Sequence, residues 1–163
     1  LISSVTFKLA KKPSVKTSYG AIQEVLATKG ISQPSIREVA DAVIEIRQSK
    51  LPDPKQIGNS GSFFKNPTVS ASKAARLISE NLGIPHYPLE GSSDVKFPAG
   101  WFIEKAGWKG FRRGDAGVHA KQALVLVNYG EAKGEEILAL SEEIKKSILD
   151  TFGVVLETEV NIL

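Results

Sequence analysis

The sequence predicts an α+β fold, in which a mixed β-sheet packs against several helices in a single domain, residues 1–163. Helical and strand-like patterns both recur along the chain, but they do not alternate strictly as they would in an α/β protein. The length of 163 residues suits one domain, and the 42% apolar and 24% charged residues are typical of a globular protein.

The first third of the chain is expected to hold one strand and two helices. Apolar and polar residues alternate over 5–9, which is the period of a strand with one buried face. A short helical pattern over 22–30 ends at a glycine, which commonly stops a helix. Ser35 and Glu38 have the spacing of a capping box, and this predicts a helix over 36–48.

Residues 50–67 have the most unusual chemistry, because prolines and glycines interrupt a run of polar and aromatic residues. Proline fixes the backbone and removes an N–H donor, whereas glycine permits conformations that other residues avoid. We therefore expect a rigid ligand-binding loop. Its side chains that suit an anionic, oxygen-rich ligand are Lys50, Asn59, Ser62, Lys65 and Asn66.

The remainder of the chain is expected to contain three helices, two strands and a loop. The loop at 84–94 is irregular and carries Tyr87, so it is a candidate lid. A continuous apolar run at 123–127 is typical of a strand that is covered on both faces. The other elements are a helix from Ser70 to Gly83, a short helix over 98–106, a long helix over 135–152 and a last strand over 154–162.

The composition excludes several classes of function. The chain has no cysteine, which excludes disulfides and thiolate chemistry, and its two histidines make a histidine-rich metal site unexpected. No apolar run reaches the roughly 18 residues of a membrane span, so we expect no membrane partner. The net charge of +3 is too small to indicate a nucleic-acid partner by itself, and none is expected.

A local cluster of basic residues with aromatic neighbours leaves alternatives open. A solvated basic face is the simplest interpretation, and a surface for an anionic ligand is the next. A nucleic-acid surface is a further rival, which tight and salt-resistant binding would favour. The basic residues are Lys105, Lys109, Arg112, Arg113 and Lys121.

Two residues could carry acid–base chemistry. Ser62 lacks the spacing of a nucleophile elbow and an identifiable base, so a hydroxyl that donates a proton or a hydrogen bond is favoured over a nucleophile. Glu157 and Glu159 share one face of the predicted last strand. Such pairs usually face solvent, but Glu159 becomes a candidate acid, base or orienting group if that face lines a cleft.

Four motifs follow one another along the chain. They occupy residues 58–67 (GNSGSFFKNP), 99–104 (AGWFIE), 118–125 (VHAKQALV) and 152–160 (FGVVLETEV). In this order they closely resemble the UDP-N-acetylenolpyruvoylglucosamine reductase family. The resemblance covers nearly the whole chain and concerns the carboxy-terminal, substrate-binding domain of that family.

The resemblance implies a cytoplasmic oxidoreductase of peptidoglycan biosynthesis that uses FAD and NADPH. NADPH reduces the flavin, which passes hydride to the enolpyruvyl double bond of UDP-N-acetylglucosamine enolpyruvate, and a proton completes UDP-N-acetylmuramate. By motif position, Ser62 is implied to donate that proton, and Glu159 to lie beside the enolpyruvyl carboxylate. The residues implied to bind the nucleotide-sugar substrate are Tyr19, Lys50, Asn66, Tyr87, Lys109 and Gln122.

The resemblance also implies a partner, the amino-terminal FAD-binding domain of the family. That domain is not expected in this sequence, which opens without methionine, so the chain alone is expected to be inactive. Thr158 and Asn161 stand where the family commonly has proline and arginine, and the Asn161 difference could loosen the Glu159 strand. A non-catalytic nucleotide-sugar binding module is the alternative function, although such a module would not need the Ser62 proton donor.

Overall fold

The computed structural model describes residues 2–162, and the chain falls into two compact units that divide between Lys50 and Leu51. The expected α+β class is confirmed, because helices occur in both units and β-sheets occur in the second. Every strand pair described in residues 2–162 is antiparallel, and the strands form two small sheets.

The first unit is built on two helices, α1 (Ile22–Thr28) and α2 (Ile36–Lys50), which pack together through a small apolar cluster. The predicted capping box at α2 is confirmed. The Glu38 N–H donates to Ser35 Oγ at 3.3 Å, and the Ser35 N–H donates to the Glu38 carboxylate at 2.7 Å. The Ser35 hydroxyl and then its backbone N–H hold the pKa of Glu38 below its ordinary value of 4.5.

The strand predicted over 5–9 is wrong. No strand is formed there, and Phe7 is 76% exposed, with Val5 and Leu9 exposed as well. Alternation creates an apolar face, but a strand also needs a neighbour to accept its backbone hydrogen bonds. Within residues 2–162 no such neighbour pairs with this segment.

The first sheet of the second unit has the strand order β1-β7-β6-β5. Its strands are β1 (Gly58–Ser62), β5 (Arg112–Arg113), β6 (Ala116–Val118) and β7 (Val125–Asn128). The helix α5 (Gly134–Phe152) packs against β6 and β7, as predicted for 135–152, and Gly153 ends it with a φ of +65°. The expected loop at 50–67 therefore contains a strand, β1. It was not predicted because its glycines and polar residues have low strand propensity.

The second sheet is smaller and has the order β2-β4-β3. Its strands are β2 (Thr68–Val69), β3 (Tyr87–Pro88) and β4 (Val95–Lys96). In the sequence, α3 (Ala71–Glu80) lies between β2 and β3, and α4 (Ala99–Lys105) follows β4. The helix predicted from Ser70 to Gly83 is found as α3, with Ser70 at the N-cap position, but the Ser70 side chain makes no capping hydrogen bond and the helix ends at Glu80. The short helix predicted over 98–106 is confirmed as α4, and Tyr87 lies on β3 within the expected irregular loop.

The carboxy-terminal segment over 154–162 is extended but forms no regular strand. An antiparallel bridge between Phe64 and Thr158 pairs it with the segment that follows β1. The predicted division of its faces is confirmed, since Val154 and Leu156 are buried while Glu157 and Glu159 are exposed.

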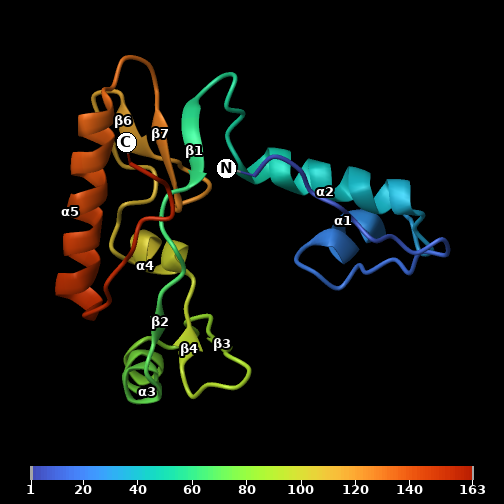
Figure 1. The fold of residues 1–163 in the computed structure, drawn as a ribbon, viewed down its shortest axis with the longest axis horizontal. Coiled ribbons are helices and arrows are strands. Elements are labelled where there is room, and N and C mark those ends of the chain that lie inside the picture. Colours follow the sequence, from blue (N-terminus) through green and yellow to red (C-terminus); the bar gives the residue numbers. More distant parts are fainter. Residues whose placement is uncertain (1, 163) are drawn as a thin grey trace. The chain divides into compact units, whose positions relative to one another are not determined.

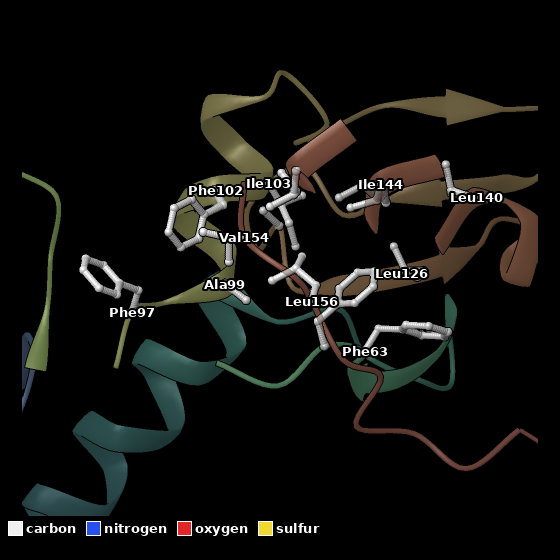
Figure 2. Packing of buried hydrophobic residues seen from close by; sticks show 14 of the residues in the cluster. Phe63, Phe97, Ala99, Phe102, Ile103, Leu126, Leu140, Ile144, Val154 and Leu156 are labelled. Atoms are coloured by element: carbon white, nitrogen blue, oxygen red, sulfur yellow. The ribbon is translucent and has the colours of Figure 1, made fainter. Parts of the chain in front are cut away.

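One hydrophobic cluster holds the second unit together (Figure 2). Phe63, Leu126 and Leu156 belong to it, and α5 contributes Ile144. Figure 1 shows α5 running beside the first sheet, with α4 near its end. Because Phe63 belongs to the cluster, the backbone next to Ser62 is anchored in the core.

Replacing Gly117 with alanine is expected to destabilise the second unit. The new Cβ would lie 2.8 Å from the Phe111 carbonyl oxygen and 2.9 Å from Cε2 of Tyr129, and the former is backbone that cannot swing away. We expect a loss of about 1–3 kcal/mol in the free energy of unfolding, measured by urea denaturation. Gly134→Ala, with no heavy atom within 4 Å of its Cβ, is the control and should be neutral. Equal denaturation midpoints would contradict the close packing at Gly117.

Within residues 2–162, none of the helices combines the length and the apolar character that crossing a lipid bilayer requires.

Candidate functional site

Ser62 lies at the end of β1, where the strand is irregular. Asn59 pairs with Val127 and Ser62 pairs with Val125, so β1 carries one extra residue between the two pairs. Gly61 has a φ of +75°, a conformation that glycine adopts readily. A bulge of this kind re-aims a side chain, and bulges are common next to active sites.

Glu159 is brought beside Ser62 by the backbone. The Glu159 N–H donates to the Phe63 carbonyl oxygen at 2.8 Å, and the Lys65 N–H donates to the Glu157 carbonyl oxygen at 2.9 Å. Glu159 is thus paired with the residue that follows Ser62. The spacing of the sequence could not link these two residues, but the fold places them on neighbouring segments.

Neither of these two candidate side chains is engaged within the described part of the chain. Ser62 and Glu159 are both exposed, and in residues 2–162 the Ser62 hydroxyl and the Glu159 carboxylate make no hydrogen bond. Buried Phe63 and Phe64 follow Ser62, while buried Leu156 precedes Glu159. Both groups are therefore exposed side chains on a backbone that the core holds in place.

Asn66 and Gln122 lie at the amino-terminal end of α4. The Ala99 N–H donates to Oδ1 of Asn66 at 2.9 Å, which leaves the Asn66 amide nitrogen for another partner. Gly100 lies against Gln122, because a Cβ added there would be 3.6 Å from Gln122 Oε1. The end of α4 thus connects these two predicted substrate-binding residues.

The turn that carries Gln122 also leads back to Ser62. The Val125 N–H donates to the Gln122 carbonyl oxygen at 3.1 Å, and the Phe63 N–H donates to the Leu124 carbonyl oxygen at 2.8 Å. Ser62, Asn66, Gln122 and Glu159 therefore belong to one connected neighbourhood of the second unit.

A cleft of about 480 Å³ opens beside Asn66. Val155 and Glu157 line it from the exposed face of the carboxy-terminal segment, whereas Ser62 and Glu159 are not among its lining residues. Its charged lining is mixed, since Lys65 donates to the Glu157 carboxylate at 3.1 Å and Lys73 donates to the Gly153 carbonyl oxygen.

Two further predicted residues lie elsewhere in the second unit. Tyr87 is exposed on β3, opposite Lys96 of β4. Lys109 follows the carboxy-terminal end of α4 and donates to the Glu104 carboxylate at 3.0 Å. Asn66 therefore contacts the first residue of α4, whereas Lys109 pairs with Glu104 near the last residue of that helix.

Tyr19 and Lys50 belong to the first unit. Tyr19 lies in the turn before α1 and is highly exposed. Lys50 is the last residue of α2, where an exposed cation also suits the helix dipole.

Two residues that we expected to be free ligand donors are engaged within the protein. Lys65 pairs with Glu157, and the Asn59 side chain bonds to the backbone of its own segment. Both were predicted to bind a ligand because they are polar residues of the expected loop. In the structure, their side chains instead make contacts within the protein.

The basic cluster is largely paired with acidic residues. Arg113 makes a bidentate contact with Glu143 at 2.6 and 2.8 Å, which raises the pKa of Arg113 and lowers that of Glu143. Arg112 donates to Asp115 at 2.9 Å. Since such pairing reduces the field that a phosphate backbone would meet, a nucleic-acid surface is disfavoured here.

His119 was not singled out by its sequence context, yet its ring is unusual. Its Nδ1 is buried without a hydrogen-bond partner in the described part of the chain. Burial, and then the charge of Lys121, hold the pKa of His119 below its ordinary value of 6.5. Its backbone N–H donates to the Val125 carbonyl oxygen at 2.9 Å, so His119 and Val125 close the turn that carries Gln122.

The low pKa of His119 predicts a loss of stability in acid. Below pH 6.5 the unfolded chain binds a proton that the folded chain resists, so stability is full above that pH and falls as the pH drops through the lower, folded pKa. His119→Gln should reduce this fall, measured by urea denaturation at about pH 8 and about pH 5.5. The control, His86→Gln, retains His119 and should show the same fall in stability as the native protein. Identical pH profiles for the native protein, His119→Gln and His86→Gln would contradict the assignment of the fall to His119.

No group of three His, Cys, Asp or Glu residues that could hold a metal ion occurs within residues 2–162.

Comparisons with known proteins identify the family of this chain. Residues 53–163 match the family model described as UDP-N-acetylenolpyruvoylglucosamine reductase, C-terminal domain. A relative of that name from Flavobacterium johnsoniae is 52% identical over 100% of this chain and 48% of its own length. Another from Chromobacterium violaceum is 48% identical over the same shares. The chain thus spans about half the length of the curated relatives it matches.

The solved structure of UDP-N-acetylenolpyruvylglucosamine reductase from Thermus caldophilus is also similar, with 24% identity over 77% of this chain and 34% of that chain, at a TM-score of 0.43. The family itself follows from the sequence matches, which are both long and close. Since the family model covers most of the chain and relatives are about half identical along all of it, the chain belongs to the UDP-N-acetylenolpyruvoylglucosamine reductase family.

Proposed function

We propose that this chain is the substrate-binding part of an FAD-dependent, NADPH-using reductase that converts UDP-N-acetylglucosamine enolpyruvate to UDP-N-acetylmuramate. Family membership supports the reaction class and a role in peptidoglycan precursor synthesis. The observation that carries the proposal is the backbone bond from Glu159 to Phe63, which holds the carboxylate segment next to Ser62. We further propose that the reaction takes place in the cytoplasm.

The site fits a flavin-dependent reaction at its reacting end. When bound, FAD would supply hydride to the enolpyruvyl double bond. The exposed Ser62 hydroxyl and Glu159 carboxylate lack internal partners within residues 2–162, so both can meet a substrate that is held against the flavin. We propose that a separate FAD-binding part of the protein holds the flavin, and that this chain alone is inactive.

Ser62 is proposed to act as the proton donor. Hydride addition to one carbon of the double bond leaves negative charge on the other, and the Ser62 hydroxyl donates its proton there to complete the lactyl ether. Solvent then returns a proton to the serine oxygen. Glu159 is proposed to orient the enolpyruvyl group and to assist the transfer, because it lies beside the donor.

The remaining predicted residues are proposed to bind the UDP portion. The Asn66 amide nitrogen and Gln122 can donate hydrogen bonds to diphosphate or sugar oxygens, since within residues 2–162 Asn66 forms a side-chain hydrogen bond through its oxygen alone. Lys50 and Lys109 are proposed to supply positive charge, which anionic phosphates favour, with Lys109 exchanging its Glu104 partner for the phosphate. Tyr19 and Tyr87, both highly exposed, are proposed to contact the nucleotide sugar as well.

The test is an assay of the protein that contains this chain together with its FAD-binding part. NADPH oxidation should require UDP-N-acetylglucosamine enolpyruvate and should not occur with UDP-N-acetylglucosamine, which lacks the double bond. Tight binding of the enolpyruvyl compound without any NADPH oxidation would overturn the proposal. That result would favour a nucleotide-sugar binding module instead.

A further inference from the structure

We propose that Asn59 is a positioning residue for Ser62, because its carboxamide holds the bulge that sets the face of β1 on which Ser62 lies. This inference rests on the proposed function, in which Ser62 donates a proton. Asn59 was expected to be a donor for the ligand, and the structure points to a different use for its side chain.

The bulge changes the face of the sheet on which Ser62 lies. In a regular strand, residues three apart point to opposite faces of the sheet. Asn59 and Ser62 are three apart, yet they pair with Val127 and Val125, which are two apart on β7 and share a face. The extra residue therefore brings Ser62 to the same face as Asn59, and a regular β1 would send it to the other.

The Asn59 side chain spans the start of this bulge. Its Nδ2 donates to the Ile57 carbonyl oxygen at 2.9 Å, and its Oδ1 accepts from the Gly61 N–H at 3.1 Å. The second bond fixes the residue whose φ of +75° makes the bulge. Asn59 is half-buried, and its bond to the Ile57 carbonyl oxygen is partly shielded from water, whereas its bond from the Gly61 N–H is exposed.

Ser62 is held from its other side by different groups. The Phe63 N–H donates to the Leu124 carbonyl oxygen at 2.8 Å, and the buried ring of Phe63 packs in the core. Asn59 is thus the side chain that ties the upstream half of the bulge. Without it, Gly61 can relax toward other conformations, and the hydroxyl of Ser62 loses a fixed place relative to the substrate.

The experiment measures the two half-reactions of the FAD-bound full-length protein by stopped flow. Asn59→Ala should slow reoxidation of the reduced flavin by the enolpyruvyl substrate about tenfold, because a small displacement of a proton donor is costly. Reduction of the flavin by NADPH should be unchanged. Asn59→Asp keeps an acceptor for the Gly61 N–H and should recover most of the lost rate.

A matched control is present on the neighbouring strand. Asn128 also accepts a backbone N–H two residues on, from Gly130 at 2.9 Å, but it pairs with Gly58 at the opposite end of β1 from Ser62. Asn128→Ala should lower stability without a selective effect on flavin reoxidation. If it slowed reoxidation as much as Asn59→Ala does, the positioning role would be overturned.

Adding Asn59→Ala to a protein that already carries Ser62→Ala separates this inference from the proposed function. In a Ser62→Ala protein, the added Asn59→Ala change should slow reoxidation no further, since Asn59 acts through Ser62. If the rate losses of Asn59→Ala and Ser62→Ala multiplied in the double variant, the inference would be overturned. Full activity of Ser62→Ala alone would instead overturn the proposed function, whereas a slow Ser62→Ala beside a normal Asn59→Ala would overturn only the inference.

Gly61→Ala keeps the inference testable if Asn59→Ala does not fold. A Cβ at Gly61 meets no atom within 4 Å, so the change strains only the backbone that Asn59 holds. It should slow the same half-reaction as Asn59→Ala. A Gly61→Ala protein with native reoxidation would show that the bulge does not control the donor.

Discussion

Replacing Ser62 with alanine is expected to lower kcat for the enolpyruvyl substrate by roughly 10²–10⁴-fold, the usual contribution of a positioned proton donor. The KM should change little, because the hydroxyl acts on charge that develops in the transition state. Steady-state NADPH oxidation measures both constants. The expected loss is among the largest for any single exposed residue of this chain, since Ser62 is outside the core and its removal should leave the fold intact.

The control for Ser62 is another serine on the same strand. Ser60 is also exposed on β1, and Ser60→Ala should retain native kcat. Reduction of the flavin by NADPH should be native in both variants. A Ser62→Ala protein with native kcat, or one whose loss lies wholly in KM, would show that the hydroxyl is not the donor.

Phe64→Ala is expected to have the largest effect on stability near the site, a loss of about 3–5 kcal/mol in the free energy of unfolding. Phe64 is 1% exposed, and its ring meets that of Phe63 edge-on with centroids 5.2 Å apart. Its backbone also forms the bridge to Thr158, so the cavity would loosen the contact that holds Glu159. Urea denaturation measures the change.

An exposed apolar residue provides the comparison for Phe64. Leu82 is 95% exposed, so Leu82→Ala should shift the free energy of unfolding by less than about 0.5 kcal/mol. If Phe64→Ala proved as mild as Leu82→Ala, the carboxy-terminal segment would not be anchored as the structure describes.

The helices of this protein could be predicted well because their signals are local. The capping box of Ser35 and Glu38 and the stop at Gly153 each depend on a few neighbouring residues, and each is found in the structure. The alternation over 5–9 was just as clear, but a strand depends on a distant neighbour as well as its own pattern. The same dependence hid β1, whose residues pair with β7 despite low strand propensity.

The candidate site divides in the same way. Family resemblance singled out Ser62 and Glu159 as residue types in motifs, and the faces of the last segment were readable from its alternation. Their proximity could not be read, because it rests on the bond between Glu159 and Phe63, which are far apart in sequence. The use of Asn59 was also hidden, since an amide can bind a ligand or its own backbone and the sequence does not distinguish the two.

Ser62 and Glu159 are proposed to act together on one substrate, and a double-mutant cycle tests this most directly. Single-turnover reoxidation of the reduced flavin by the enolpyruvyl substrate would be measured for the native protein, Ser62→Ala, Glu159→Gln and the double variant. We predict that each single change slows reoxidation and that the double variant is little slower than the slower single, because the two residues serve one step. Losses that multiply, or a native rate in Glu159→Gln, would contradict a shared site.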